Sequence, residues 1–304
     1  MRLAPVRRTL LAASLLPLVA ACRSNPAPVA DEHAGMDHGT GAATTPTAGA
    51  SAAAAGLPPD AESAAARLAA SPRHGEYVMI AAGPAATDSI RAWVVYPERK
   101  TKAPVVVVIH EIFGLSTWIR GVADQLAADG YIAVAPDLLT GRVAPDAPDS
   151  LKVAAIRTLA PDVALRGIEA AGRYGMSLPA AVQKFGVVGF CWGGSASFSS
   201  AATIPTLGAA VAYYGAAPVG RVDMAATKAP VLALYGENDA RVNATIPAAD
   251  SALKAAGTRF EREVYTGAGH GFLRQQSGQN GANGAAAREA WPRTIAWFRQ
   301  HLGE

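Results

Sequence analysis

The segment 186–194, with the sequence GVVGFCWGG, constrains the fold of this chain more than any other. Its apolar first half predicts a buried strand, and the small residues of 195–202 predict a tightly packed helix. Between them lies Gly189-x-Cys191-x-Gly193, the glycine spacing of a nucleophile elbow, in which the central residue takes a strained backbone position. Cys191 is therefore our candidate nucleophile. A glycine-rich turn around a buried structural cysteine is the alternative that this pattern alone leaves open.

Two further residues follow in the chain order nucleophile, acid, histidine that this kind of turn requires. Asp239 comes just after the apolar segment 231–235, and His270 lies in a glycine-rich loop after the strand-like segment 260–265. We expect Asp239 to orient His270, and His270 to exchange protons with Cys191.

Both partners have rivals. Glu237, two residues from Asp239, is the runner-up acid, whereas Asp137 precedes the nucleophile, which argues against it. Among the other histidines, only His110 lies near a segment with plausible chemistry. The other two that we considered are His74, before the first predicted strand, and His301, near the end of the terminal helix.

The segment 104–110, PVVVVIH, contains five consecutive β-branched residues with no polar alternation. Such a strand is covered on both faces, as in a parallel sheet. In the elbow fold, one backbone N–H of the oxyanion hole comes from the loop after this strand and the other from the residue after the nucleophile. We therefore predict that the amides of Ile112 and Trp192 stabilise the charge of a tetrahedral intermediate.

Strand-like and helix-like segments alternate along residues 75–304, a length sufficient for one well-buried domain. This alternation predicts an α/β domain with a mostly parallel eight-stranded sheet and helices on both faces. The strands are expected near 76–81, 90–96, 104–110, 131–135, 184–188, 209–214, 230–235 and 260–265. The helices are expected after Thr117, around 161–175, after Trp192, around 246–256 and from about 284 to 301.

Taken together, the motifs resemble those of the dienelactone hydrolase family of α/β-hydrolases. The matching segments are HEIFG at 110–114, PDL at 136–138, GFCWGG at 189–194, YYG at 213–215, GEND at 236–239 and GHGF at 269–272. The resemblance implies an α/β-hydrolase fold and hydrolysis of a small ester or lactone through a Cys-His-Asp triad and a thioester. The sequence has no dinucleotide-binding fingerprint, so it implies no diffusible cofactor.

The same resemblance implies roles for residues around the triad. Glu111 matches a glutamate that controls the thiol and receives its proton when substrate enters. Arg274 matches an arginine that grips the substrate carboxylate, while Gly271 stands where the best-studied members often have serine. The candidates for the family's second arginine stay open; they are Arg142, Arg157 and Arg166.

The beginning of the chain predicts export. Basic residues precede a short apolar run, so that residues 1–21 resemble a lipoprotein signal peptide, and Cys22 closes a lipobox. Lipidation of Cys22 would anchor the protein to a bacterial membrane in the cell envelope, facing the periplasm or exterior. Cys191 would then have no second cysteine with which to form an internal disulfide.

Residues 22–74 are rich in alanine, glycine and proline and show no apolar periodicity, so we predict a disordered tether. His33, Met36 and His38 within it are ligand types that copper accepts. A solvated linker is the favoured interpretation, because closing unordered ligands around an ion is entropically costly.

The net charge of +3 and the scattered arginines give little support for nucleic-acid binding, and no phosphate-binding loop or cysteine pair for zinc is present. We expect a monomer that binds a small-molecule ester or lactone, with no resident metal. The competing hypothesis is a membrane-anchored binding or metal-handling lipoprotein that keeps the hydrolase fold without catalysis.

Overall fold

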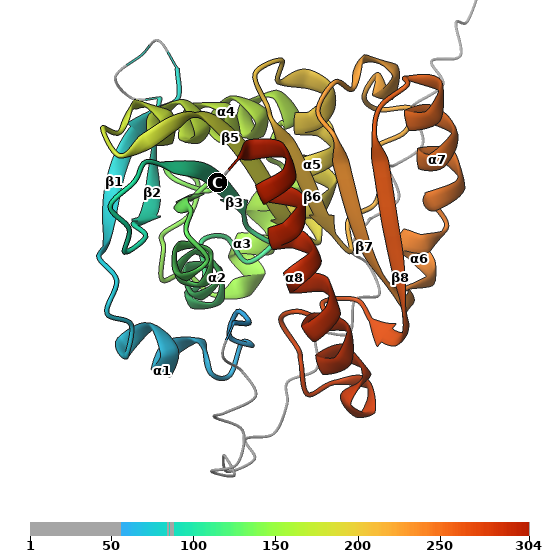
Figure 1. Cartoon of the computed structure of the whole chain (residues 1–304), viewed down its shortest axis with the longest axis horizontal. Coiled ribbons are helices and arrows are strands. Elements are labelled where there is room, and N and C mark those ends of the chain that lie inside the picture. Colours follow the sequence, from blue (N-terminus) through green and yellow to red (C-terminus); the bar gives the residue numbers. More distant parts are fainter. Residues whose placement is uncertain (1–55, 84, 86–87, 304) are drawn as a thin grey trace, which may run out of the picture. The chain divides into compact units, whose positions relative to one another are not determined.

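The computed structural model describes residues 56–83, 85 and 88–303. Eight strands form one sheet in the order β1-β2-β4-β3-β5-β6-β7-β8 (Figure 1). The strands are β1 Gly75–Ala81, β2 Ser89–Val95, β3 Ala103–Ile109, β4 Ile132–Pro136, β5 Ala181–Phe190, β6 Ala209–Tyr213, β7 Val231–Asn238 and β8 Phe260–Gly269. β2 runs antiparallel to both of its neighbours, β1 and β4, and every other pair of adjacent strands is parallel, which confirms the predicted sheet.

Helices connect the strands and cover both faces of the sheet. They are α1 Ala64–Ala69, α2 Thr117–Ala128, α3 Asp149–Arg157, α4 Pro161–Ser177, α5 Trp192–Thr203, α6 Ala240–Asn243, α7 Ile246–Ala255 and α8 Ala282–Leu302, with short 3₁₀ turns at Met224–Ala226 and Gln279–Gly281. The sequence predicts the helices that carry a clear apolar face and misses α1, α3 and α6. α3, for example, buries only Ile156, so its pattern gives no periodic signal.

Two adjacent residues of β5 show how the layers are built. The ring of Phe185 packs on Gly172 of α4, where an added Cβ would lie 2.4 Å from a ring carbon. The next residue, Gly186, faces Phe298 of α8 on the other side. Because successive side chains of a strand point to opposite faces, α4 and α8 cover opposite faces of the sheet. The neighbouring strand β3 is buried at every position, as its unbroken β-branched sequence predicts.

The predicted boundary at residue 75 is wrong, because the described residues before it are ordered. Leu57 is buried, the indole N–H of Trp118 donates to the carbonyl of Pro59 at 2.9 Å, and Arg73 pairs with Asp124 at 2.6 Å. These contacts use backbone carbonyls and an ion pair, which leave no periodic apolar pattern in the sequence. The predicted signal peptide, Cys22 and the possible metal ligands of the tether lie outside the described residues.

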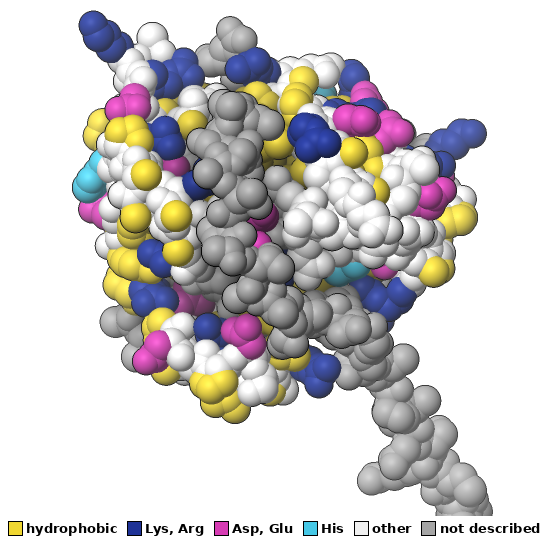
Figure 2. Space-filling view, turned by 90° about the horizontal axis from the view of Figure 1, so that it is seen from below, with side chains coloured by type: hydrophobic (Ala, Val, Ile, Leu, Met, Phe, Trp, Pro, Cys, Tyr) yellow, Lys and Arg dark blue, Asp and Glu magenta, His cyan; other side chains and the backbone are white. Residues whose placement is uncertain are grey.

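On the face of the molecule in Figure 2, basic and acidic side chains are interspersed rather than separated by sign. Within residues 56–83, 85 and 88–303, no helix combines the length and the apolar character needed to cross a bilayer.

Candidate active site

Cys191 lies at the sharp bend between β5 and α5. Its φ of 56° and ψ of −115° place it in the left-handed region that non-glycine residues rarely adopt. The flanking glycines are required by close approach: a Cβ on Gly189 would lie 1.9 Å from the carbonyl oxygen of Gly193, and a Cβ on Gly193 would lie 2.4 Å from that of Ile109. The amide of Cys191 donates to the carbonyl of Tyr213 on β6 at 3.1 Å. The bend is therefore a nucleophile elbow with a cysteine at its apex.

Asp239 and His270 meet at the same edge of the sheet. Asp239 follows β7 directly and caps α6, and His270 follows β8, the next strand in the sheet. The imidazole Nδ1 of His270 lies 2.5 Å from Oδ2 of Asp239. Both side chains are largely buried, with 20% and 6% of their surfaces exposed. The structure thus brings together the two residues that the sequence singled out as acid and base.

The surroundings of His270 favour its protonated form. Burial by itself would lower the pKa of His270, but the hydrogen bond to Asp239, the proximity of Cys191 and the charges of both partners raise it to about 10. The imidazole thus lies close to the cysteine, and its buried Nε2 makes no other hydrogen bond within the described residues. An imidazole in this position can exchange a proton with the sulfur or with a leaving group.

The rival acids make other contacts. The carboxylate of Glu237 accepts from the amide of Gly267 at 2.8 Å and is exposed. Asp137 pairs with Arg91 of β2 at 3.0 Å and so links β2 to the end of β4. Neither rival contacts His270 through a hydrogen bond within the described part of the chain.

His110 is buried and serves the framework. Its Nδ1 lies 2.6 Å from the carbonyl oxygen of Glu111, and its Nε2 accepts from the amide of Leu138 at 3.2 Å. Since Nε2 accepts, Nδ1 carries the proton and donates it. Burial lowers the pKa of His110, which keeps the ring neutral. The histidine therefore fixes the backbone of Glu111, a role that the sequence did not indicate.

Glu111 and Arg274 form an ion pair. The sequence predicts a separate role for each residue and does not predict that they pair. The guanidinium Nε lies 3.3 Å from Oε2 of Glu111, and the guanidinium also stacks over Phe113 at 5.0 Å from the ring centre. Glu111 is buried, which raises its pKa, while the charges of Arg274 and His270 lower it. The charge state of Glu111 therefore depends on where Arg274 is held.

The two predicted oxyanion donors come from the loop after β3 and from the elbow itself. Ile112 is in the loop after β3 and is buried, and Trp192 is the first residue of α5. The first N–H groups of a helix have no acceptor inside it and favour negative charge. Their assignment as an oxyanion hole stays a prediction.

The second substrate-binding arginine also stays unassigned. Arg142, Arg157 and Arg166 are all exposed, and Arg166 pairs with Asp162 one turn away on α4. Gly271 has a φ of 74°, a conformation that a serine at this position would adopt only with strain.

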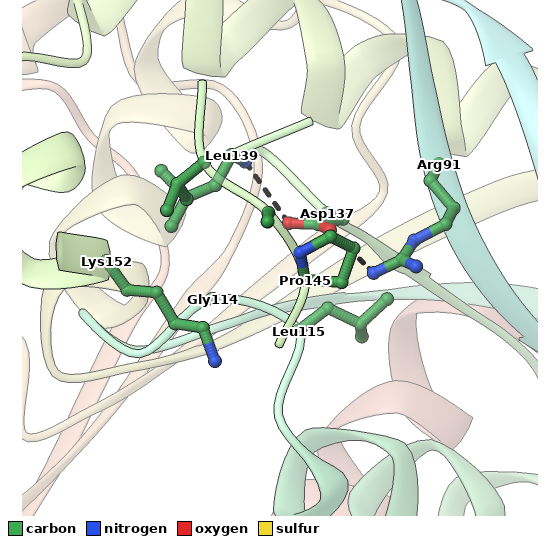
Figure 3. Close-up of a pocket in the computed structure, with 9 residues that line it drawn as sticks. Arg91, Gly114, Leu115, Asp137, Leu139, Pro145 and Lys152 are labelled. Carbon is green, nitrogen blue, oxygen red and sulfur yellow. Dashed lines mark hydrogen bonds and ion pairs between the residues drawn. The ribbon is translucent and has the colours of Figure 1, made fainter. Parts of the chain in front are cut away.

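A separate small pocket lies near Asp137 (Figure 3). Arg91 and Lys152 line it together with the loop residues Gly114 and Leu115, and Figure 3 shows Arg91 reaching toward Asp137. Its volume is about 10 Å³. That volume holds about one water molecule, so this pocket is too small for a substrate. Among the described residues, no group of three or more histidine, cysteine and acidic side chains has the arrangement of a metal site.

A cysteine on a nucleophile elbow, with a His-Asp pair after the seventh and eighth strands of such a sheet, defines an α/β-hydrolase. The chain belongs to the dienelactone hydrolase family, whose model matches residues 90–302. As a member of this family, it is a hydrolase of carboxylic esters or lactones.

The comparisons agree with this assignment. The chain is 33% identical to a protein of Salmonella typhimurium named "Putative carboxymethylenebutenolidase", over 73% of this chain and 86% of that protein. It is 30% identical to a Bradyrhizobium protein named "Probable 2-oxo-3-(5-oxofuran-2-ylidene)propanoate lactonase", over 71% and 91% of the two chains. Among solved structures, the "Putative Dienelactone Hydrolase" of Klebsiella pneumoniae matches with a TM-score of 0.64 and 28% identity, over 75% of this chain and 99% of that one.

Proposed function

We propose that the chain hydrolyses a small lactone or ester that carries a carboxylate, with Cys191, His270 and Asp239 as its catalytic triad. The observation that supports this most directly is the sulfur at the strained elbow within reach of an imidazole that Asp239 holds. The relatives named as lactonase and carboxymethylenebutenolidase support a lactone as the substrate class.

The first half of the reaction forms a thioester. Substrate carboxylate draws Arg274 away from Glu111, which is then buried without its cation and takes the proton of Cys191. The thiolate attacks the carbonyl carbon, and the amides of Ile112 and Trp192 hold the oxyanion. When the tetrahedral intermediate collapses, the bond to the leaving oxygen breaks and His270 donates its Nε2 proton to that oxygen.

The second half releases the product. Neutral His270 removes a proton from a water molecule, which attacks the thioester carbon. The C–S bond then breaks, the acid product leaves, and the Cys191 thiolate recovers its proton from Glu111, whose carboxylate pairs with Arg274 again. Asp239 stays ionised throughout and keeps the Nδ1 proton of His270 in place.

Substrate charge provides the test of this proposal. We expect a lactone that bears a carboxylate to be hydrolysed with a higher kcat/KM than a neutral lactone or aryl ester of similar size. Arg274→Gln should raise KM for the anionic substrate by about 10- to 100-fold, since a hydrogen bond to a charged group is lost. The KM for neutral esters should change far less.

Arg173→Gln is the matched control, because it removes a guanidinium that pairs with Glu169 one turn away on α4. Arg274→Lys keeps the charge and removes the planar fork, so it should recover only part of the affinity. Equal KM values for anionic and neutral substrates in the unaltered protein would contradict a carboxylate-bearing substrate.

We also propose that the protein works in the cell envelope, anchored through Cys22. Expressed as the full chain, it should sediment with membranes and be extracted by detergent, whereas Cys22→Ser should lose the lipid and release the domain. Fractionation of the two forms measures this. Membrane association that survives the Cys22→Ser change would contradict lipid anchoring at this residue.

A further inference from the structure

Tyr214 is a buried tyrosine in a strained position beside the candidate nucleophile. It follows β6, which pairs with β5 in the sheet (Figure 1), and its φ is 39°. A bulky residue in this region of φ is held there by its surroundings, at a cost of about 1–3 kcal/mol. Its amide donates to the carbonyl of Leu234 at 2.8 Å. The next residue, Gly215, packs so closely on Gly194 that a Cβ there would lie 2.3 Å from a backbone carbon.

The ring of Tyr214 is fixed by aromatic contacts. Its centre lies 5.1 Å from that of His270 and 5.3 Å from that of Phe272. The hydroxyl is fully buried and makes no hydrogen bond. A buried hydroxyl without a partner is unfavourable by about 1–3 kcal/mol, so such groups are uncommon in folded proteins.

A second buried polar atom without a hydrogen bond belongs to Glu111. Oε2 of Glu111 is buried and makes no hydrogen bond, although it lies 3.3 Å from the guanidinium of Arg274. Burial and then the charge of Glu111 raise the pKa of Tyr214, followed by the charge of Cys191. The phenol is thus a protonated donor near Glu111, whose Oε2 makes no hydrogen bond.

We infer that Tyr214 is a positioning residue that takes over the carboxylate of Glu111 when substrate draws Arg274 away. This inference rests on the proposed function. One carboxylate oxygen accepts from the hydroxyl of Tyr214 and the other faces the thiol of Cys191. A neutral donor holds Glu111 less firmly than a guanidinium does, so Glu111 stays able to accept a proton. The hydrogen bond survives protonation, because the carbonyl oxygen of the acid remains an acceptor.

Tyr214→Phe tests this with the ring retained. We expect kcat for an anionic lactone to fall about tenfold, the value of one hydrogen bond to a charged group, while hydrolysis of neutral esters changes by less than about twofold. Neutral esters do not draw Arg274 away, so Glu111 stays paired with Arg274 and does not need the hydroxyl of Tyr214. A loss that is equal for both substrate classes would overturn the inference.

The matched control is Tyr213→Phe, which removes the neighbouring buried hydroxyl. That hydroxyl is hydrogen-bonded to Thr294 at 2.7 Å. Tyr213→Phe should lower the unfolding temperature and leave the preference for anionic substrates unchanged. Tyr214→Phe should unfold at or above the temperature of the unaltered protein, because it removes an unpaired hydroxyl. A fall in unfolding temperature for Tyr214→Phe, with unchanged substrate preference, would assign the hydroxyl to the fold.

Alkylation of Cys191 separates failure of this inference from failure of the proposed function. Iodoacetate carries a carboxylate that draws Arg274, whereas iodoacetamide is neutral, and neither reaction requires turnover. Tyr214→Phe should slow alkylation by iodoacetate about fivefold or more and leave iodoacetamide nearly unaffected. If Tyr214→Phe changes the two alkylation rates by the same factor, Tyr214 does not have this role, and this outcome can be reached even if no substrate is hydrolysed.

Discussion

Cys191→Ala should reduce kcat/KM for activated esters and lactones by at least about 10⁴-fold, the scale of losing a covalent nucleophile. Without the sulfur no thioester forms, and only the oxyanion donors and binding remain. The side chain is small and sits at a bend fixed by Gly189 and Gly193, so the fold should be unchanged. Steady-state kinetics with an aryl ester measures the loss, and circular dichroism checks the fold.

Cys191→Ser is the companion variant, since it keeps a nucleophilic atom in the same strained position. Its activity should fall between those of the unaltered protein and the alanine variant. Cys191 is the one cysteine among residues 56–83, 85 and 88–303, so iodoacetamide labelling of the domain should map to it and disappear in the alanine variant. Turnover that survives Cys191→Ala would refute the assignment.

Asp239→Asn should lower kcat by about 10³- to 10⁴-fold, because an amide can donate to Nδ1 and favour the wrong tautomer of His270. The change also shifts the pH profile. The hydrogen bond and charge of Asp239 help to raise the pKa of His270 to about 10. The imidazolium is present below that pKa and is lost above it, so activity should decline at high pH. Removing Asp239 lowers this pKa, and the decline should move to lower pH.

Glu237→Gln is the matched control for this experiment. It neutralises a carboxylate two residues away that binds the amide of Gly267 rather than His270. Its kcat and its pH profile should stay close to those of the unaltered protein. If Glu237→Gln is as damaging as Asp239→Asn, the acid of the triad has been assigned to the wrong residue.

Much of the architecture was predictable because it depends on local patterns. The unbroken β-branched run of β3 requires cover on both faces, and the structure buries every residue of it. The spacing of Gly189 and Gly193 around Cys191 predicts a bend that only glycines permit there, and their close backbone contacts give the reason. Helices with weak apolar faces, such as α3, were missed because their contacts with the core are few.

By itself, the sequence determined the sheet, the elbow and the strand ends that carry Asp239 and His270, because the carboxyl ends of parallel strands meet at one edge. Only the tertiary structure decided which side chains pair there. Glu111 and Arg274 are 163 positions apart in the chain and form one ion pair. The hydroxyl of Tyr214 is buried without a hydrogen bond, and burial together with the charge of Glu111 raises its pKa. Pairing between distant residues follows from how loops converge in three dimensions, and no local pattern encodes it.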